Sequence, residues 1–162
     1  MSNSNYLVVK DKVQRFAKQL FNIVELNDDG SLSIPYESTH IFIEVFDMTS
    51  NDAEMNAFRK ENDLSFTIVS IWAMVLVDVK PNNELYKWVA VDGQSFDFGG
   101  FKVIVRDDGL ANVVYRTAIG GDNLDAGELK EALLSVAATA DNNDEMLKSR
   151  FGGNTVNDLR NS

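Results

Sequence analysis

An apolar segment without a charged residue runs for 14 positions, from Leu64 to Val77, between Asp63 and Asp78. It is rich in β-branched and aromatic residues, which favour strands. A membrane-spanning helix needs about 20 apolar residues, so this segment is too short to cross a bilayer in that form. We therefore predict a long strand at residues 65–79. Because apolar residues occupy both of its faces, both faces need a cover.

Tight turns link the other predicted strands. Asp29-Gly30 and Asp107-Asp108-Gly109 stand between apolar runs, and such turns favour hairpins because Gly and Asp tolerate positive φ angles. Hairpins imply antiparallel pairing. The polar residues 49–62 are expected to form a connection. Strands are predicted at residues 23–26, 31–36, 39–47, 95–98, 101–106 and 112–117.

Apolar residues at helical spacing predict two helices, over residues 8–22 and 83–91. A third and longer helix is predicted over residues 126–151. Asp125 is its N-cap, and an acidic residue three positions further on completes a capping box. The polar patch at residues 141–145 could break or kink this helix.

The order of these elements predicts the fold class. A helix, several strands, a short helix, further strands and a long helix indicate an α+β domain. Its N-terminal, middle and long C-terminal helices pack on a twisted antiparallel sheet. A chain of 162 residues fits one domain. We place that domain at residues 1–153 and expect residues 154–162 to form a polar, frayed tail.

Composition excludes several kinds of site. The chain has no cysteine and a single histidine, His40, which excludes thiol chemistry, cysteine zinc sites and His-rich metal sites within one chain. Its 25 acidic and 15 basic residues give a formal charge of −10, which opposes binding to nucleic acid and to anionic membranes. Residues 1–6 lack the pattern of a signal peptide, so we expect a cytoplasmic protein.

Paired acidic residues invite comparison with catalytic and metal-binding carboxylates. Acid–base catalysis needs a carboxyl group that is shielded from water. The pairs lie in predicted turns or on a polar helix face, so we expect them to be solvated and predict no catalytic residue, no metal and no cofactor. His40 is expected to be a surface residue of its strand. The acids are Asp28, Asp29, Asp107, Asp108, Asp141, Asp144 and Glu145.

Aromatic residues are numerous, with ten Phe, four Tyr and two Trp. If helices cover one sheet face, the other needs a second helix layer, a second subunit or a bound peptide. The candidate peptide-binding residues are the aromatic residues predicted on that second face or beside the Gly99-Gly100 pair. They are Phe42, Phe46, Phe66, Trp72, Phe98 and Phe101.

Four stretches of the sequence, in this order, resemble a known family. They are SIPYEST at 33–39, NELYKWVA at 83–90, LDAGEL at 124–129, and ADNNDEML at 140–147 followed by FGG at 151–153. Together they are similar to the YbjN-like proteins, in the bacterial branch described as type III secretion chaperone-like. The resemblance implies a secretion-chaperone-like α+β fold, frequent dimers, and binding of peptides or proteins without catalysis. It assigns no catalytic residue to this chain.

Three functional hypotheses follow. The first is a non-enzymatic cytoplasmic protein, chaperone-like or regulatory, that binds a peptide or protein client through its sheet as a homodimer. The second is an enzyme or small-ligand-binding protein with a carboxylate-lined pocket. The third is an interaction module that uses the basic face of the first helix, at Lys12, Arg15 and Lys18.

Overall fold

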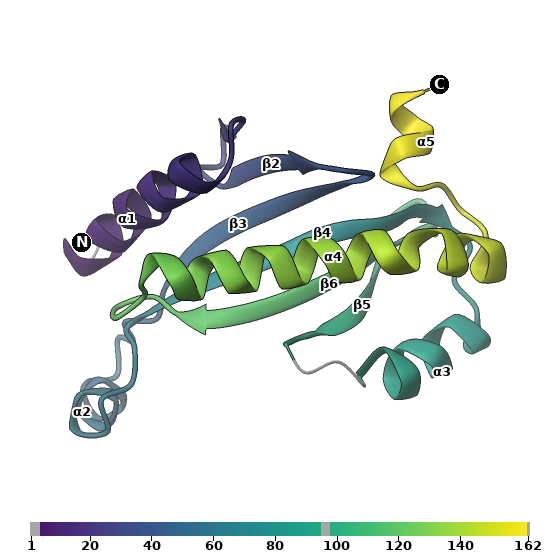
Figure 1. The fold of residues 1–162 in the computed structure, drawn as a ribbon. Helices are drawn as coiled ribbons and strands as arrows, with labels where there is room; N and C mark the ends of the chain where they lie inside the picture. Colours follow the sequence, from purple (N-terminus) through teal and green to yellow (C-terminus); the bar gives the residue numbers. More distant parts are fainter. Residues whose placement is uncertain (1–3, 95–97, 162) are drawn as a thin grey trace.

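The computed structural model describes residues 4–94 and 98–161. A twisted sheet forms one layer, and the long helix α4 crosses it with α1 packed beside α4 (Figure 1). This arrangement confirms the predicted α+β class. The elements are α1 (Ser4–Leu20), β1 (Glu25–Leu26), β2 (Leu32–Tyr36), β3 (Thr39–Asp47), α2 (Ala53–Glu61), β4 (Thr67–Val79), α3 (Asn83–Val91), a 3₁₀ turn (Asp92–Gln94), β5 (Gly100–Val105), β6 (Ala111–Gly120), α4 (Ala126–Phe151) and α5 (Val156–Arg160).

The sheet has the strand order β1-β2-β3-β4-β6-β5, and every neighbouring pair is antiparallel. β4 is the long apolar strand that the sequence predicts, and it lies between β3 and β6. Within it, Ile71 stands opposite Ile43 of β3 and Thr117 of β6. The predicted turn at Asp29-Gly30 closes the β1–β2 hairpin, with Gly30 at a φ of 81°, a value that glycine adopts without strain.

The hydrophobic core lies between one face of the sheet and the helices. Alternate residues in the middle of β3 and β4 point into this core and are removed from solvent. Burying each of these aliphatic side chains contributes about 1.5–3 kcal/mol, so this layer is the main apolar source of stability. The central core residues are Ile41, Ile43, Val69, Ile71 and Ala73 from the sheet, and Leu133, Val136, Ala137 and Ala140 from α4.

The helix α4 has the predicted bounds. The Asp125 carboxylate accepts a hydrogen bond from a backbone N–H of the first turn at 2.8 Å, as the N-cap prediction requires. Residues 141–145 stay helical, so this polar patch does not break the helix. The physical reason is that Asp144 of this patch faces inward, where the Ser38 hydroxyl donates to its carboxylate at 2.8 Å and satisfies it.

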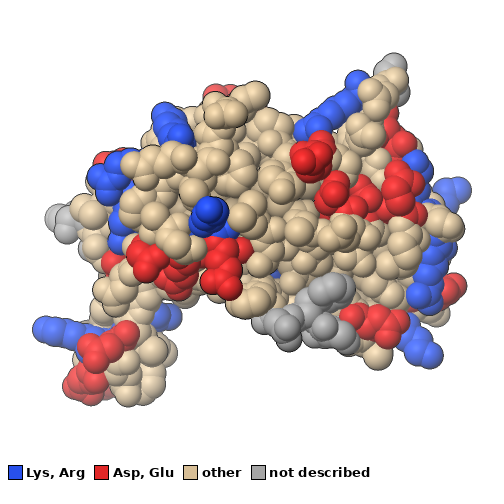
Figure 2. Space-filling model, in the orientation of Figure 1, with Lys and Arg blue, Asp and Glu red and all other residues tan. Residues whose placement is uncertain are grey.

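The connection between β3 and β4 contains a helix, α2, that we did not predict. Asp52 caps it by accepting from the Glu54 N–H at 2.9 Å. None of the described α2 side chains is buried, and Met55 and Phe58 are exposed. The helix projects from the body of the molecule and carries both acidic and basic side chains (Figures 1 and 2). With no buried apolar stripe, α2 lacks the periodic signal that identifies helices in a sequence.

The C-terminal segment also differs from expectation. Residues 154–161 do not fray, because α5 forms there and begins at a capping box between Thr155 and Asp158. Asn154 makes an isolated antiparallel bridge to Val77 of β4. Residues 154–160 therefore contact the sheet, and the domain boundary at residue 153 stays a prediction.

Two further findings concern the ends of elements. α1 begins at Ser4, four residues before the predicted start. Of the strand predicted at 95–98, residues 95–97 lie outside the described residues and Phe98 is in a turn. Within residues 4–94 and 98–161, no helix combines the length and the apolarity needed to cross a membrane.

Candidate functional site

The second face of the sheet is the candidate site, because α1, α3 and α4 all contribute to the core on the first face. Side chains alternate between the two faces of a strand. Since Ile41 and Ile43 point into the core, Phe42 and Glu44 of β3 point to the second face. By the same alternation Trp72 of β4 points there too. We call this second face the open face.

An aromatic stack occupies the middle of the open face. Phe42 and Trp72 are directly opposite each other on β3 and β4, with ring centroids 4.2 Å apart and ring planes inclined by 15°. The His40 ring lies 6.0 Å from that of Phe42. Aromatic pairs of this kind contribute about 0.5–1.5 kcal/mol beyond the burial of area. The stack therefore presents a broad, flat apolar surface whose rings hold each other in place.

Polar side chains adjoin the aromatic stack. Arg116 of β6 stands opposite Trp72, and its Nε donates to the buried Ser70 hydroxyl at 2.7 Å. Glu44 lies 4.0 Å from another guanidinium nitrogen of Arg116. Both charged side chains are partly exposed, so this ion pair contributes less than about 1 kcal/mol. Its role is to fix the guanidinium beside the apolar surface.

One end of the open face is covered by α5. A hollow of about 260 Å³ separates this helix from the sheet. Leu159 of α5 is still 51% exposed, so α5 covers this end only in part. The hollow is lined by Ser33, His40, Phe42, Met74 and Val77 of the sheet and by Val156 and Leu159 of α5.

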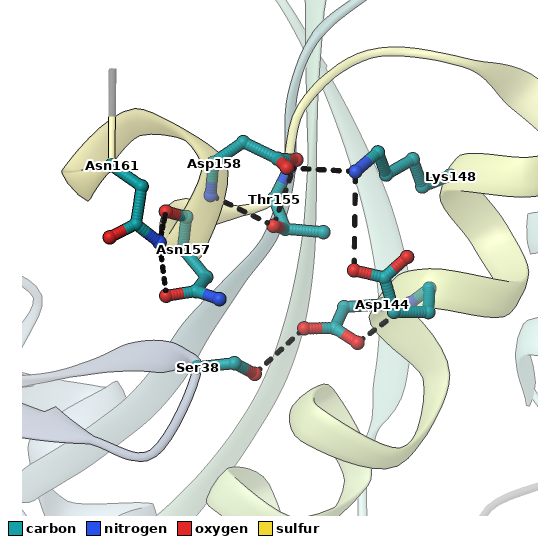
Figure 3. A network of polar contacts seen from close by, with 8 residues as sticks. Ser38, Asp144, Lys148, Thr155, Asn157, Asp158 and Asn161 are labelled. Carbon is teal, nitrogen blue, oxygen red and sulfur yellow. Dashed lines mark hydrogen bonds and ion pairs between the residues drawn. The ribbon is translucent and has the colours of Figure 1, made fainter.

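A charge-assisted hydrogen bond joins α5 to α4, and a capping box within α5 holds its acceptor (Figure 3). Lys148 of α4 donates to the Asp158 carboxylate at 2.8 Å, and the Thr155 N–H donates to the same carboxylate at 2.7 Å. The bond from Lys148, followed by the bonds from Thr155, lowers the pKa of Asp158 to about 2. Acidic side chains gather on the surface where α4 approaches α5 (Figure 2). The single Lys148–Asp158 pair thus ties α5 to a region that is otherwise negative.

Arg160 anchors the other side of α5 to the start of β3. Its guanidinium donates to the carbonyl oxygens of Glu37 at 3.1 Å and Thr39 at 3.3 Å, and it lies 2.9 Å from His40 Nδ1. Partial burial, and then the nearby charge of Arg160, lower the pKa of His40. His40 is therefore a partly exposed strand residue that adjoins the aromatic stack.

The structure separates the six predicted aromatic residues. Phe42 and Trp72 form the stack, Phe46 is exposed further along the same face of β3, and Phe66 immediately precedes β4. Phe98 is exposed in the turn before β5.

Phe101 has no place on the open face. It is 1% exposed and packs in the core against Trp88 and Tyr115, with both ring centroids 5.0 Å away. The register of β5 places Phe101 opposite Tyr115 and Gly100 opposite Arg116. Phe101 therefore points to the helix side, and we leave it out of the candidate site.

Several residues of the site were missed by the sequence analysis. An arginine within the apolar strand β6, Arg116, was a usable signal, because a charge in such a strand must point away from the core. The pattern Thr155-x-x-Asp158 was another, since a capping box marks the start of a helix. The roles of Ser70 and Met74 depend on strand register and carry no local signal.

The predicted solvation of the acidic pairs is wrong for Asp144. This side chain is 5% exposed, and its carboxylate and that of Asp141 both lie within hydrogen-bond distance of the Ser38 hydroxyl. These contacts tie the β2–β3 turn to α4 and give the carboxylate a structural role. Across residues 4–94 and 98–161, no three acidic or histidine side chains come together as a metal site would require.

The basic face of α1 is partly used within the molecule. Lys12 Nζ donates to the carbonyl oxygen of Asp122 at 3.3 Å. The Arg15 guanidinium lies 5.5 Å from the ring centroid of its neighbour Phe16. At least one of the three cations in the third hypothesis therefore serves the packing of α1.

Comparisons with known proteins give a family and a fold. A family profile described as T3SS (YopN, CesT) and YbjN peptide-binding chaperone 1 matches residues 8–159. The structure is similar to that of YbjN, a putative transcription regulator from E. coli, with a TM-score of 0.56 and 10% sequence identity over 84% of this chain and 91% of that chain. No curated protein matches the sequence significantly.

A second similar structure is the Yersinia pestis type III secretion chaperone SycH in complex with a stable fragment of YscM2. Its TM-score is 0.48 and its identity 11%, over 83% of this chain and 98% of that chain. The family profile spans nearly the whole sequence, and the likeness to YbjN shows the shared fold. The chain thus belongs to the T3SS and YbjN peptide-binding chaperone family.

Proposed function

We propose that this protein is a non-enzymatic binding protein that holds an apolar peptide segment of a client protein on its open face. The observation that carries the proposal is the Phe42–Trp72 stack. Apolar side chains on a face opposite the helices exceed what the core needs, and aromatic residues dominate the binding energy of protein interfaces. The family's description as peptide-binding supports the same class of ligand.

The polar neighbours of the stack suit a peptide ligand. An apolar side chain of the client would lie on the rings of Phe42 and Trp72, while its backbone carbonyls or an acidic side chain would face Arg116. A guanidinium has five N–H donors, and the Ser70 hydrogen bond uses only one of them. We therefore expect preference for segments that combine large apolar residues with an acidic one.

The proposal includes a cytoplasmic location and a homodimer. The sheet offers a contact for a second copy at β5, which is an edge strand. Its Ile104 and Val105 side chains are about half exposed, and exposed strand edges pair readily with other chains. Sedimentation of the purified protein over a range of concentrations would test the dimer.

Peptide selection followed by substitution tests the binding proposal. Random 12-residue peptides displayed on phage would be selected against the wild-type protein, and the best binder would be labelled for fluorescence anisotropy. We expect Trp72→Ala and Phe42→Ala each to weaken its binding by about tenfold or more. Phe58→Ala, which changes an aromatic residue on α2 that is 54% exposed and lies outside the sheet, is the control. Peptides that bind all four proteins equally would refute the proposal.

A further inference from the structure

The C-terminal segment makes the kind of contact with the sheet that an added strand would make. The last paired residues of β3 and β4 at this end are Ile41 and Ala73, and Val77 lies beyond them. The Val77 N–H donates to the Asn154 carbonyl at 2.8 Å, and the Asn154 N–H donates to the Val77 carbonyl at 2.9 Å. One residue of the tail thus extends the sheet, as peptides do when they bind a strand edge.

The next residues place a helical turn on the open face. Val156 and Leu159 are three positions apart, so they lie on one side of α5. Both line the hollow shared with Phe42 and Met74. The apolar surface that is proposed to receive a client is therefore already occupied at one end by two aliphatic side chains.

Arg160 supplies a specific polar contact at the end of this turn. It follows Leu159 directly and donates to the two carbonyl oxygens at Glu37 and Thr39. These acceptors favour a cation at that position, because a guanidinium can donate to both carbonyl oxygens at once.

From these contacts we infer that residues 154–160 are a built-in occupant of one subsite of the peptide-binding face. The subsite takes an extended residue that pairs with Val77, followed by a helical turn with aliphatic residues at positions i and i+3 and an arginine at i+4. A client segment of the same pattern binds by displacing α5. This inference rests on the proposed function and identifies both the partner chemistry and its regulation.

The attachment of α5 is weak enough for displacement. A helix of five residues has little stability of its own, and Leu159 remains 51% exposed. The Lys148 and Asp158 side chains of its ion pair are 32% and 35% exposed, and exposed pairs contribute little. A client can bind only those molecules in which α5 is undocked. The apparent affinity for the client is therefore the intrinsic affinity multiplied by the undocked fraction.

The test uses the full chain with α5 released by Leu159→Asp and Arg160→Ala together. The probe is a labelled peptide of residues 152–161, and binding is followed by anisotropy and by amide NMR shifts. We expect the peptide to bind this variant at least tenfold more tightly than the wild type. Shifts should change at Val77 and Met74.

Two controls accompany this variant. Leu134→Asp places the same charge on the exposed side of α4, at a residue that is 37% exposed, and it should leave peptide binding at the wild-type level. Asp158→Asn removes the carboxylate that Lys148 and Thr155 hold and should give an intermediate gain. It also provides a second route to α5 release if the double variant unfolds.

The outcomes separate this inference from the proposed function. If phage-selected peptides bind the wild type and the α5-released variant equally, the function stands and the inference is overturned. If the peptide of residues 152–161 binds the variant but selected peptides depend on neither Phe42 nor Trp72, the subsite is supported and the proposed function fails. A wild-type dimer that dissociates in the variant, without peptide binding, would make α5 a subunit contact and overturn the inference.

Discussion

The two faces of β4 carry similar apolar side chains in different surroundings. On the helix side, Val69, Ile71 and Ala73 have no exposed surface. On the open face, Ile68 and Trp72 are only partly buried. Residue type alone therefore does not decide which face of an apolar strand becomes core. The face that the helices cover becomes core. The face that they do not cover is a surface that can bind another chain.

Matched substitutions on the two faces of β4 can test whether the faces contribute differently to stability. Ile71→Ala should lower the free energy of unfolding by about 2–5 kcal/mol, because it leaves a cavity beneath α4. Ile68→Ala removes the same atoms from the open face and should cost about half of that or less. Urea unfolding measures both. Equal losses would mean that the open face is as firmly packed as the core.

A double-mutant cycle sharpens the description of the open face. Replacing Phe42 and Trp72 by Ala, singly and together, should reveal a coupling of about 0.5–1.5 kcal/mol in urea unfolding. The cycle of Trp72 with Phe58 should show no coupling, because Phe58 lies on α2, which projects from the body of the molecule (Figure 1). If the losses of unfolding free energy for Phe42→Ala and Trp72→Ala simply add in the double variant, the two rings do not stack in the free protein.

Acid should loosen α5 from the sheet. The pKa of Asp158 falls from its usual 3.8 to about 2 through the contacts with Lys148 and Thr155. A depressed carboxyl pKa contributes stability above the unfolded value, and that contribution is lost as the pH falls through the folded value. We expect the Val77–Asn154 pairing to open progressively between about pH 4 and pH 2.

Amide NMR of Asn154 measures this opening, and Asp158→Asn should remove most of its pH dependence. The pKa of Asp122 also lies below its usual value: burial raises it, but hydrogen bonds from Thr67 and Phe66 outweigh that effect. Protonation of Asp122 at low pH therefore also removes stabilising contacts. An unchanged acid profile in Asp158→Asn would assign the opening to another carboxyl group.

Local signals account for the parts of the fold that the sequence predicts well. The cap at Asp125 and the apolar stripe that follows it define α4 within its own residues. The strand β4 is recognisable from its composition. In contrast, α5 contains few apolar residues, and its position depends on Val77, Lys148 and the start of β3. The capping box marks where α5 begins, but nothing in the local sequence shows where the helix docks.

The candidate site shows the same limit at the level of single residues. Phe42 and Trp72 follow from the alternation of side chains along two strands. Phe98 and Phe101 stand at the ends of one short stretch, yet only the register of β5 reveals that Phe101 belongs to the core. The buried Asp144 was missed because its partner, Ser38, lies in a turn far away in the sequence.

The projecting helix α2 lies in a long loop, and closing that loop has an entropic cost. Residues 48–66 form a long loop between two paired strands, and its helix contributes no buried side chain among those described. Closing a flexible loop has an entropic free-energy cost. This cost is smaller by roughly 0.6 kcal/mol for each halving of the loop length. The folded state therefore carries an entropic load that a short hairpin would lack. This junction is the point where the domain can best accept a change of length.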